Sequence, residues 1–258
     1  MISNKELKKY NKKNSHSYTF SMFPTFELLQ NKVQYVEMVL LHTNVSKENR
    51  KKVYDICEKN NIDITINDHI IERIRDKDNC LLIGVFRKYS CELVHNRNHV
   101  VLVNPSDSGN MGTIIRTCVG FGIHDLAVIE PAVDIFSPKV VRATMGALFH
   151  INFQSFSSFE EYYKKYGNER KIYPFMLKGA VALDEIYPEN VPFSLVFGNE
   201  ATGLDDGWLD VGKSILIPHS KEIDSLNLSL AVGIGLYEFT KKVKSPDKKY
   251  QCRHNSCG

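Results

Sequence analysis

Short apolar runs alternate with helix-like segments along the second half of the chain, and this alternation constrains the fold more than any other feature. Residues 100–103 and 126–129 are apolar runs of strand length, separated by a glycine-rich turn and a helical pattern over 114–119. Further runs follow at 171–175, 193–197 and 214–217, and a helical pattern over 226–242 closes the series. Strands that alternate with helices form mostly parallel sheets flanked by helices, so the pattern predicts an α/β fold.

The first third of the chain carries a smaller version of this pattern. Apolar runs at 36–41, 62–66 and 81–86 accompany a helical pattern over 47–59, which predicts a small α/β domain. The polar stretch that follows, residues 95–99, has the composition of a linker. We therefore predict a small α/β domain over 1–94, a larger domain over 98–242 and a basic tail over 243–258.

Basic residues gather at the two ends of the chain. In the whole sequence 33 Lys and Arg exceed 30 Asp and Glu, a formal charge of +3. The first 14 residues hold five lysines against Glu6, and residues 241–258 hold six basic residues against Asp247. The part between is therefore mildly acidic, and the net charge does not by itself indicate a nucleic-acid partner. We expect solvated, partly frayed ends, including a flexible basic N-terminus.

Cysteine usage and hydropathy indicate a cytoplasmic protein. The six cysteines show no paired framework, and no signal peptide is recognisable at the N-terminus. The longest apolar stretch, within 226–239, is too short and too interrupted for a membrane span. Cys252, His254 and Cys257 lack a second ligand pair at zinc-finger spacing, so we expect neither a metal site nor a membrane partner.

Several common catalytic or nucleotide-binding motifs are absent from the sequence. The turn after residue 103 has its glycines spaced Gly-x-x-Gly, which does not fit the Gly-x-Gly-x-x-Gly of dinucleotide-binding folds. Neither the phosphate loop of nucleoside triphosphatases nor the Gly-x-Ser-x-Gly of serine hydrolases occurs.

Three loops that each follow a strand remain as candidates for chemistry. The first, 104–112, opens a helix that brings Asn110, Thr113 and Arg116 into line by steps of three residues. Such a helix start suits the binding of a phosphate or a sugar hydroxyl. An ordinary capped helix with a surface arginine and no ligand would show the same pattern. The second, 197–204, places Glu200 between two glycines, and the third, 217–227, ends in residues that can cap the last helix or face a ligand.

In this order the loops resemble the three motifs of the SpoU (TrmH-like) branch of the SPOUT RNA methyltransferases. Residues 110–116 are similar to the first motif, 196–204 to the second and 217–238 to the third, while 137–147 resemble a further family segment. The resemblance implies a trefoil-knotted fold and methyl transfer from S-adenosyl-L-methionine to a ribose 2′-hydroxyl of ribosomal or transfer RNA. It also implies a homodimer. More weakly, the N-terminal part resembles a ribosomal-protein-like domain that binds the RNA substrate.

The resemblance also implies roles for individual residues. The catalytic group would be Arg116, Asn110, Ser225, Asn227 and Glu200, with Glu200 supporting the loops before taking part in chemistry. The methyl donor would be bound by Leu177, Gly179, Phe197, Gly198, Ile217 and Leu226, and RNA phosphates by Lys139 and Arg142. Because a guanidinium is a poor proton acceptor, we expect Arg116 to stabilise a developing alkoxide or to fix the adjacent phosphate.

Two alternatives remain open on the sequence. A protein with this fold could bind structured RNA without turnover, or could methylate one ribosomal nucleotide and so confer antibiotic resistance. The third loop also departs from the family, because His219 and Lys221 stand where relatives often have Met and Gly. This departure puts the affinity for the methyl donor in question.

Overall fold

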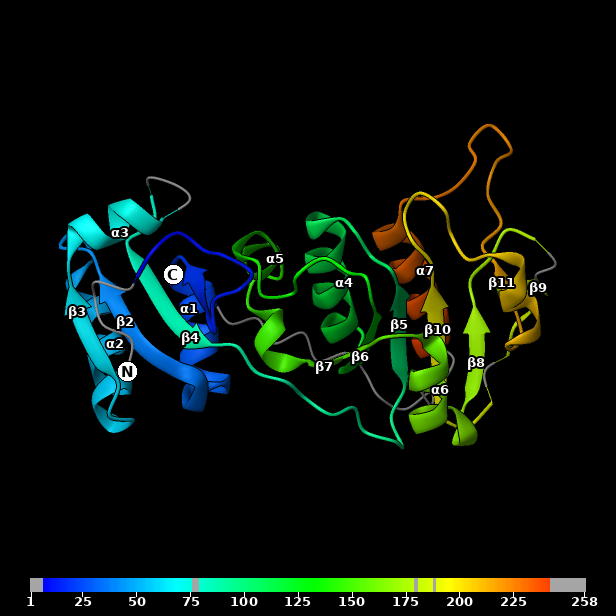
Figure 1. Cartoon of the computed structure of the whole chain (residues 1–258), viewed down its shortest axis with the longest axis horizontal. Coiled ribbons are helices and arrows are strands. Elements are labelled where there is room, and N and C mark those ends of the chain that lie inside the picture. Colours follow the sequence, from blue (N-terminus) through cyan, green and yellow to red (C-terminus); the bar gives the residue numbers. More distant parts are fainter. Residues whose placement is uncertain (1–6, 76–78, 179–180, 188, 242–258) are drawn as a thin grey trace.

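The computed structural model describes residues 7–75, 79–178, 181–187 and 189–241. Gly179 and the basic tail over 243–258 lie outside the described residues, as does the first part of the N-terminus, residues 1–6. Two main β-sheets follow one another along the long axis of the molecule (Figure 1). The smaller sheet is built from residues before Lys88, and the larger from residues after Asn98.

The first sheet has four strands in the order β1-β4-β2-β3. Its strands are β1 (His16–Phe20), β2 (Val36–Leu41), β3 (Asp63–Ile66) and β4 (Leu82–Arg87). Its helices are α1 (Met22–Asn31), α2 (Lys47–Lys59) and α3 (Asp68–Ile74). The prediction of a helix over 47–59 is confirmed, with the same first and last residues. At its start Ser46 Oγ accepts a hydrogen bond from Asn49 N, and along its inner side Val53 and Cys57 are buried.

Two elements at the start of the chain, β1 and α1, were not predicted. The residues of β1 are buried although most are polar, because Ser17 Oγ donates to the Phe136 carbonyl oxygen and Thr19 Oγ1 lies 2.7 Å from Thr25 Oγ1. Polar side chains with buried partners leave no apolar run in the sequence.

The described part of the basic N-terminus is anchored, which corrects the expectation of a frayed end. Leu7 is fully buried, and its carbonyl oxygen accepts from Arg73 Nη2 at 3.0 Å. Further along, Tyr18 OH donates to the Lys8 carbonyl oxygen at 2.7 Å and Lys88 Nζ to that of Lys12 at 2.8 Å. The segment is fixed through its backbone, so the lysine side chains remain in solvent.

The second sheet has five parallel strands in the order β7-β6-β5-β10-β8, which confirms the predicted α/β class. Its strands are β5 (His99–Val103), β6 (Asp125–Ile129), β7 (Asn152–Phe156), β8 (Lys171–Pro174) and β10 (Phe193–Phe197). The predicted strand at 214–217 instead forms a separate two-stranded sheet, in which β11 (Ile215–Leu216) pairs with β9 (Val181–Ala182).

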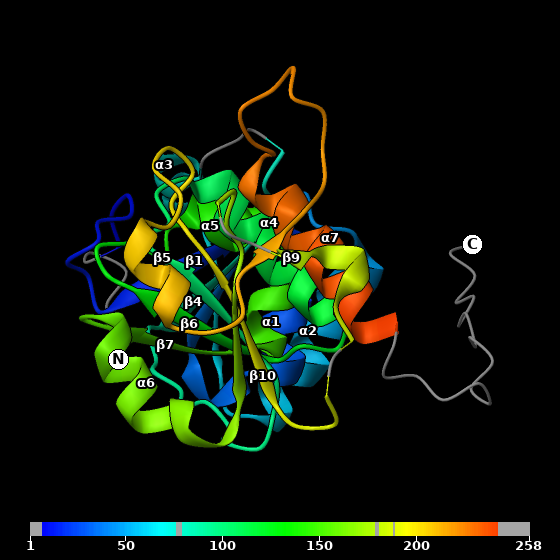
Figure 2. The same cartoon turned by 90° about the vertical axis from the view of Figure 1, so that its right-hand side faces the viewer.

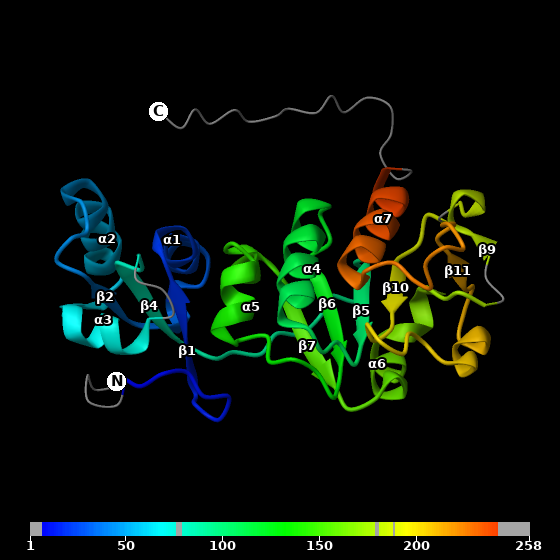
Figure 3. The same cartoon turned by 90° about the horizontal axis from the view of Figure 1, so that it is seen from above.

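Helices cover both faces of the larger sheet (Figure 3). The helices α4 (Ser108–Gly120), α5 (Pro138–Ala143) and α7 (Leu228–Lys241) lie on one face, and α6 (Phe159–Tyr166) lies on the other. Short 3-10 helices span Val33–Tyr35, Ala147–His150, Gly167–Glu169, Leu183–Glu185 and Asp206–Asp210. None of the described helices is long and apolar enough to cross a membrane.

The polar stretch predicted as a linker is held against the larger sheet. The buried Arg170 side chain donates from Nη2 to the His95 carbonyl oxygen at 2.5 Å and from Nη1 to the Arg97 carbonyl oxygen at 3.1 Å. His99 Nδ1 lies 2.9 Å from Tyr162 OH. Burial lowers the pKa of His99 to about 3, so its ring is neutral at physiological pH.

The two sheets share a hydrophobic core. Leu28 and Phe86 from the first sheet and its helix pack in one cluster with Phe136 and Phe149 from the second unit. The ring centroids of Phe86 and Phe149 are 5.6 Å apart in an edge-to-face arrangement. The N-terminal unit is therefore packed directly on the larger one.

Candidate active site

Three loops meet at the carboxyl edge of the larger sheet. They follow β5, β10 and β11, and correspond to the three stretches that the sequence singled out. In a parallel sheet the carboxyl ends of all strands lie at one edge, so loops far apart in the sequence come together there. Their meeting point is the side chain of Glu200.

The Glu200 carboxylate binds the loop after β5. Its Oε2 accepts hydrogen bonds from the backbone N and the Oγ of Ser106, at 3.1 and 2.8 Å. Its Oε1 accepts from the backbone N of Asp107 at 3.2 Å and from Asn110 Nδ2 at 3.3 Å. With Asn199 Nδ2, which donates to Oε2 at 3.4 Å, five donors converge on one carboxylate, and those from Ser106, Asp107 and Asn110 tie β10 to the start of α4.

Asn110 extends this cluster to the third loop. Its Oδ1 accepts a hydrogen bond from Asn227 Nδ2 at 3.1 Å. Asn227 Oδ1 in turn accepts from the backbone N of Ser229 at 2.9 Å and so caps the start of α7. Asn110, Glu200 and Asn227, which we call the amide–carboxylate cluster, are therefore joined in space as well as in sequence motifs.

The charge of Glu200 is fixed by these contacts. Burial raises the pKa of the Glu200 carboxyl, but hydrogen bonds from the Glu200, Ser106 and Asp107 backbone and from the Ser106 hydroxyl outweigh it. The net pKa is below the usual value of a glutamate. Glu200 is therefore an ionised anchor at neutral pH and is poorly suited to accept a proton.

The loop after β10 folds back on itself beside Gly198. A Cβ atom at Gly198 would lie 2.2 Å from the carbonyl carbon of Gly203 and 2.6 Å from the Leu204 nitrogen. Gly203 has a φ of +66°, in the left-handed region that glycine adopts most readily. The loop can close only because both positions are glycine.

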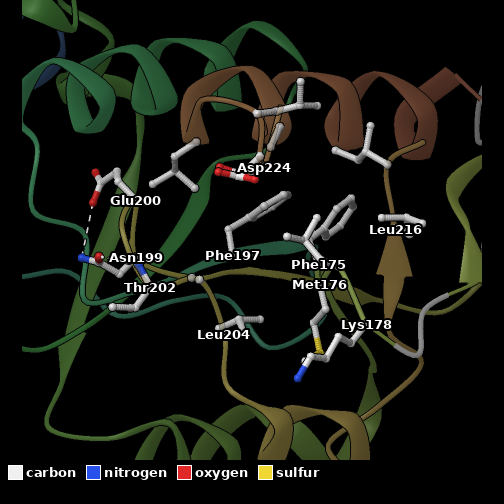
Figure 4. Close-up of a pocket in the computed structure, with 18 of the residues that line it drawn as sticks. Phe175, Met176, Lys178, Phe197, Asn199, Glu200, Thr202, Leu204, Leu216 and Asp224 are labelled. Atoms are coloured by element: carbon white, nitrogen blue, oxygen red, sulfur yellow. Dashed lines mark hydrogen bonds between the residues drawn. The ribbon is translucent and has the colours of Figure 1, made fainter. Parts of the chain in front are cut away.

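A cavity of about 700 Å³ opens beside this loop. Phe175 and Phe197 stack in its interior with ring centroids 4.3 Å apart, while Asn199 and Glu200 lie at one side and Lys178 at another (Figure 4). The predicted donor-binding residues that line the cavity are Leu177, Phe197, Gly198, Ile217 and Leu226. Ser225 lines it as well, and Gly179 lies outside the described residues.

Arg116 lies apart from the amide–carboxylate cluster. It stands six residues beyond Asn110 on α4, and its side chain is exposed. No described residue forms a hydrogen bond or ion pair with it, and it does not line the cavity. Lys139 and Arg142 lie on α5, which packs tightly on α4: a Cβ at Gly112 would lie 2.3 Å from the Ala143 Cβ.

Several residues of the site were missed by the sequence analysis. Asn199 Nδ2 donates to the Asn104 carbonyl oxygen at 2.7 Å, and Ser106 provides two of the donors to Glu200. Phe175 and Asp224 line the cavity. The rule that carboxyl ends of parallel strands share an edge could have found Phe175, because it directly follows β8. The loop contacts of Asn199 and Ser106 carry no comparable signal.

The third loop stands away from the body of the protein. The segment between β11 and α7, orange in Figure 2, projects beyond the helices. At its base His219 Nδ1 lies 2.8 Å from the Ile217 carbonyl oxygen, and His219 lines the cavity. Within the described residues there is no group of three His, Cys, Asp or Glu side chains suited to holding a metal ion.

The chain belongs to the SpoU rRNA methylase family, because the model of that family matches residues 97–237, more than half of the sequence. It is 31% identical over 146 residues to an uncharacterized tRNA/rRNA methyltransferase from Synechocystis, covering 56% of this chain and 53% of that protein. A putative tRNA (cytidine(34)-2′-O)-methyltransferase from Listeria innocua is 31% identical over 145 residues, 55% of this chain and 85% of that one. The chain spans about half the length of the Synechocystis relative.

Solved structures resemble the fold over nearly the whole chain. An S-adenosylmethionine-bound rRNA methyltransferase from Sinorhizobium meliloti superimposes with a TM-score of 0.78 at 24% identity, covering 90% of this chain and 89% of that one. The SpoU methyltransferase AviRb from Streptomyces viridochromogenes, also bound to S-adenosylmethionine, gives 0.74 at 20% identity, covering 88% and 90%. At these identities the likeness concerns the fold.

Proposed function

We propose that the protein is an RNA methyltransferase that transfers a methyl group from S-adenosyl-L-methionine to the 2′-hydroxyl of a ribose in ribosomal or transfer RNA. The observation that carries the proposal is the amide–carboxylate cluster at the rim of the 700 Å³ cavity. Family membership supports it, and so do relatives named as 2′-O-methyltransferases of rRNA and tRNA.

The cavity fits the chemistry of the methyl donor. Phe175 and Phe197 offer apolar surface suited to an adenine ring, whereas Glu200 and Asp224 add carboxylates near a ligand that carries a positive sulfonium. Leu177, Ile217 and Leu226 would hold the donor through apolar and backbone contacts, together with Gly179 in the segment outside the described residues. When bound, the donor supplies an electrophilic methyl group.

The chain's own residues would orient and activate the ribose. Asn110 stands at the rim with its amide fixed by Glu200 and Asn227, so it is pre-organised to position a sugar hydroxyl. Arg116 is free to turn toward RNA, and its guanidinium donates hydrogen bonds that stabilise negative charge developing on the 2′-oxygen. Ser225 would hold the third loop against the ligand.

RNA would cross the face formed by α4 and α5. Lys139 is exposed in the first turn of α5, and Arg142 is half-buried one turn later. Because α5 packs on α4 at Gly112 and Ala143, both side chains are carried by a helix adjacent to that of Asn110 and Arg116. We assign Lys139 and Arg142 to the RNA backbone, and the first sheet with its helices to recognition of the substrate.

We also propose a homodimer formed through α7. Leu230, Ile234 and Tyr237 follow one another at spacings of four and three residues, and their side chains are 61, 41 and 55% exposed. Phe121, the residue that follows α4, extends this stripe, with its ring centroid 6.3 Å from that of Tyr237. An exposed apolar face on a packed helix is typical of an interface with a second protein surface. A symmetric pair would place these stripes against each other.

The trefoil knot and the cytoplasmic location belong to the same proposal. The loops after β8, β10 and β11 all contribute to one cavity, and the close crossing at Gly198 and Gly203 is the point where we expect the threaded segment to be held. We place the protein in the cytoplasm because ribosomal and transfer RNA are modified there.

Methyl transfer from tritiated S-adenosylmethionine to size-fractionated cellular RNA tests the proposed function. We expect alkali-resistant label in one RNA class with the wild type and a loss of about 100-fold or more with Arg116→Ala, because a donor to the developing oxyanion is removed. Arg116→Lys keeps the charge without the planar fork and should fall between the two. Donor binding by calorimetry should be unchanged in both variants.

Two results would contradict this. Equal label from the wild type and Arg116→Ala would remove Arg116 from the chemistry. RNA binding without label, in a protein that also fails to bind S-adenosylmethionine, would instead make it an RNA-binding protein without turnover.

A further inference from the structure

A second cavity, of about 540 Å³, lies where the two β-sheet units meet. Its walls come from the segment before β1, the stretch that leaves β4, the loop after β6, and the strands β6 and β7. Among the lining residues are Lys12, Tyr89, Cys91, Glu92, Glu130 and Phe136. The residues that line it include none of the amide–carboxylate cluster and none that line the 700 Å³ cavity.

The interior of this junction cavity is aromatic and its rim is rich in acceptors. Tyr89, Phe136 and Phe153 are buried and in edge-to-face or tilted contact, with ring centroids 5.2 to 5.5 Å apart. At the rim stands Glu130, whose Oε2 accepts from the Ala132 nitrogen at 3.0 Å. No described residue donates to its Oε1, which therefore remains available to a ligand.

One wall of the junction cavity is the loop after β6, which lies at the same edge of the sheet as the candidate active site. The loop that walls it is joined to the loop after β5, because Val133 N donates to the Pro105 carbonyl oxygen at 2.8 Å. The next residue, Ser106, is the one that binds Glu200. An RNA strand whose ribose lies at Asn110 therefore has this cavity within reach of a nearby nucleotide.

The charges around the cavity favour a neutral base inside it and phosphates beside it. Glu130 makes its part of the rim unfavourable for a phosphate, whereas Glu92 is paired with Lys165 Nζ at 3.0 Å. The flanking N-terminal segment carries exposed lysines at 8, 9, 12 and 13, and its backbone is held by Lys88 Nζ at the Lys12 carbonyl oxygen. Phosphates are attracted to these lysines, while a neutral base that presents hydrogen-bond donors can approach Glu130.

We propose that the junction cavity binds an unpaired guanine base of the RNA substrate. The proposal rests on the proposed function, since it presumes an RNA substrate. Guanine presents two neighbouring donors, N1–H and the N2 amine, which match one carboxylate, whereas the other bases present a single donor group on that edge. The aromatic interior supplies apolar contact for the ring.

Alkylation of Cys91 tests the proposal without relying on methyl transfer. Cys91 is a partly buried free thiol that lines the junction cavity, so a bound base should shield it. We would measure iodoacetamide labelling of the full chain by peptide mass spectrometry with single-stranded (GU)5 or U10, and binding of each oligonucleotide by fluorescence anisotropy in the same mixtures. At about ten times the Kd, (GU)5 should slow labelling of Cys91 about tenfold. U10 at equal occupancy should leave the rate nearly unchanged.

A matched pair of variants locates the effect. Glu130→Gln replaces one acceptor oxygen by a donor amide and should reduce the protection by (GU)5 to that given by U10. Glu58→Gln removes the same charge from an exposed position on α2 and should keep the wild-type protection. Full protection in Glu130→Gln would overturn the assignment of the guanine edge to this carboxylate.

Two other outcomes separate the cavity from the proposed function. Tight binding of (GU)5 with unprotected Cys91 would overturn the guanine site alone and leave the methyltransferase proposal standing. Failure of both oligonucleotides to bind would overturn the guanine site and the RNA substrate together.

Discussion

At the scale of single residues, the side chain of Glu200 does most to hold the candidate site together. Its two oxygens accept from Ser106, Asp107 and Asn110, and Asn110 passes the connection on to Asn227. A carboxylate has acceptors only, and these partners of Glu200 are all donors. The arrangement therefore depends on ionised Glu200.

Replacing Glu200 by glutamine should loosen the three loops. The amide nitrogen of Glu200→Gln would face backbone donors, so we expect the free energy of unfolding in urea to fall by about 1–3 kcal/mol. Because the pKa of Glu200 is lowered on folding, its contribution is present above the unfolded pKa and is lost as pH falls through the folded pKa. In Glu200→Gln the free energy of unfolding should therefore lack the part that the wild type loses as Glu200 is protonated. Unchanged stability, relative to Glu58→Gln as control, would contradict the role of an anchor.

A methyl group at Gly198 should be more damaging than its size suggests. The added Cβ of Gly198→Ala would meet the backbone of Gly203 and Leu204, so the loop must open, and we expect a loss of about 3 kcal/mol in thermal or urea unfolding. Gly120→Ala, where a Cβ would meet nothing within 4 Å, is the control. Equal effects of the two substitutions would show that the crossing is unimportant for stability.

The resemblance to the SpoU motifs placed Asn110, Glu200 and Asn227 in one predicted catalytic group, and hydrogen bonds join their side chains in the structure. The resemblance could not predict which atoms meet. Ser106 and Asn199 act through hydrogen bonds between loops, and such contacts depend on loop geometry that no periodic pattern encodes.

At the scale of elements, the apolar stripe on α7 is the feature with the clearest consequence. Leu230, Ile234 and Tyr237 face outward on a helix whose opposite side is buried through Val232, Leu236 and Phe239. A helix that is apolar on both sides needs a second partner.

A charge in this stripe should separate the proposed dimer. For Ile234→Glu we expect at least about a hundredfold weaker self-association, since about 3 kcal/mol is a modest cost for burying an unpaired carboxylate. Light scattering coupled to size-exclusion chromatography measures it. Tyr54→Glu, on the exposed side of α2, should leave the mass unchanged. A wild type that is monomeric at all concentrations would contradict the dimer.

Elements were predicted well where the pattern was periodic and poorly where polar residues interrupt the apolar run. The helix over 47–59 has a Ser cap and apolar residues four apart, and it was predicted correctly. The strands β1 and β7 read His-Ser-Tyr-Thr-Phe and Asn-Phe-Gln-Ser-Phe, and both were missed. In β1 the polar residues are buried and have partners from distant parts of the chain, as with Ser17 and Phe136, whereas in β7 only the two phenylalanines are buried.

At the scale of the whole molecule, RNA recognition should show in the salt dependence of binding. For Lys139→Gln we expect the slope of log affinity against log salt concentration to fall by about 0.7, the value for one contact to a single-stranded phosphate. Lys139→Arg keeps the charge and should keep the slope. Fluorescence anisotropy from low to moderate salt measures both, and an unchanged slope in Lys139→Gln would remove this residue from the RNA interface.

The core that the two sheets share sets a limit on how this family member can be re-engineered. Leu28 and Phe86 pack against Phe136 and Phe149, and His150 Nε2 lies 2.6 Å from Glu27 Oε2 across the same boundary. Transplanting the N-terminal unit of another family member would therefore leave mismatched aromatic surfaces and an unmatched carboxylate. A chimaera that carries a different N-terminal unit must exchange the loop after β6 and the 3-10 helix at Ala147–His150 along with the first sheet.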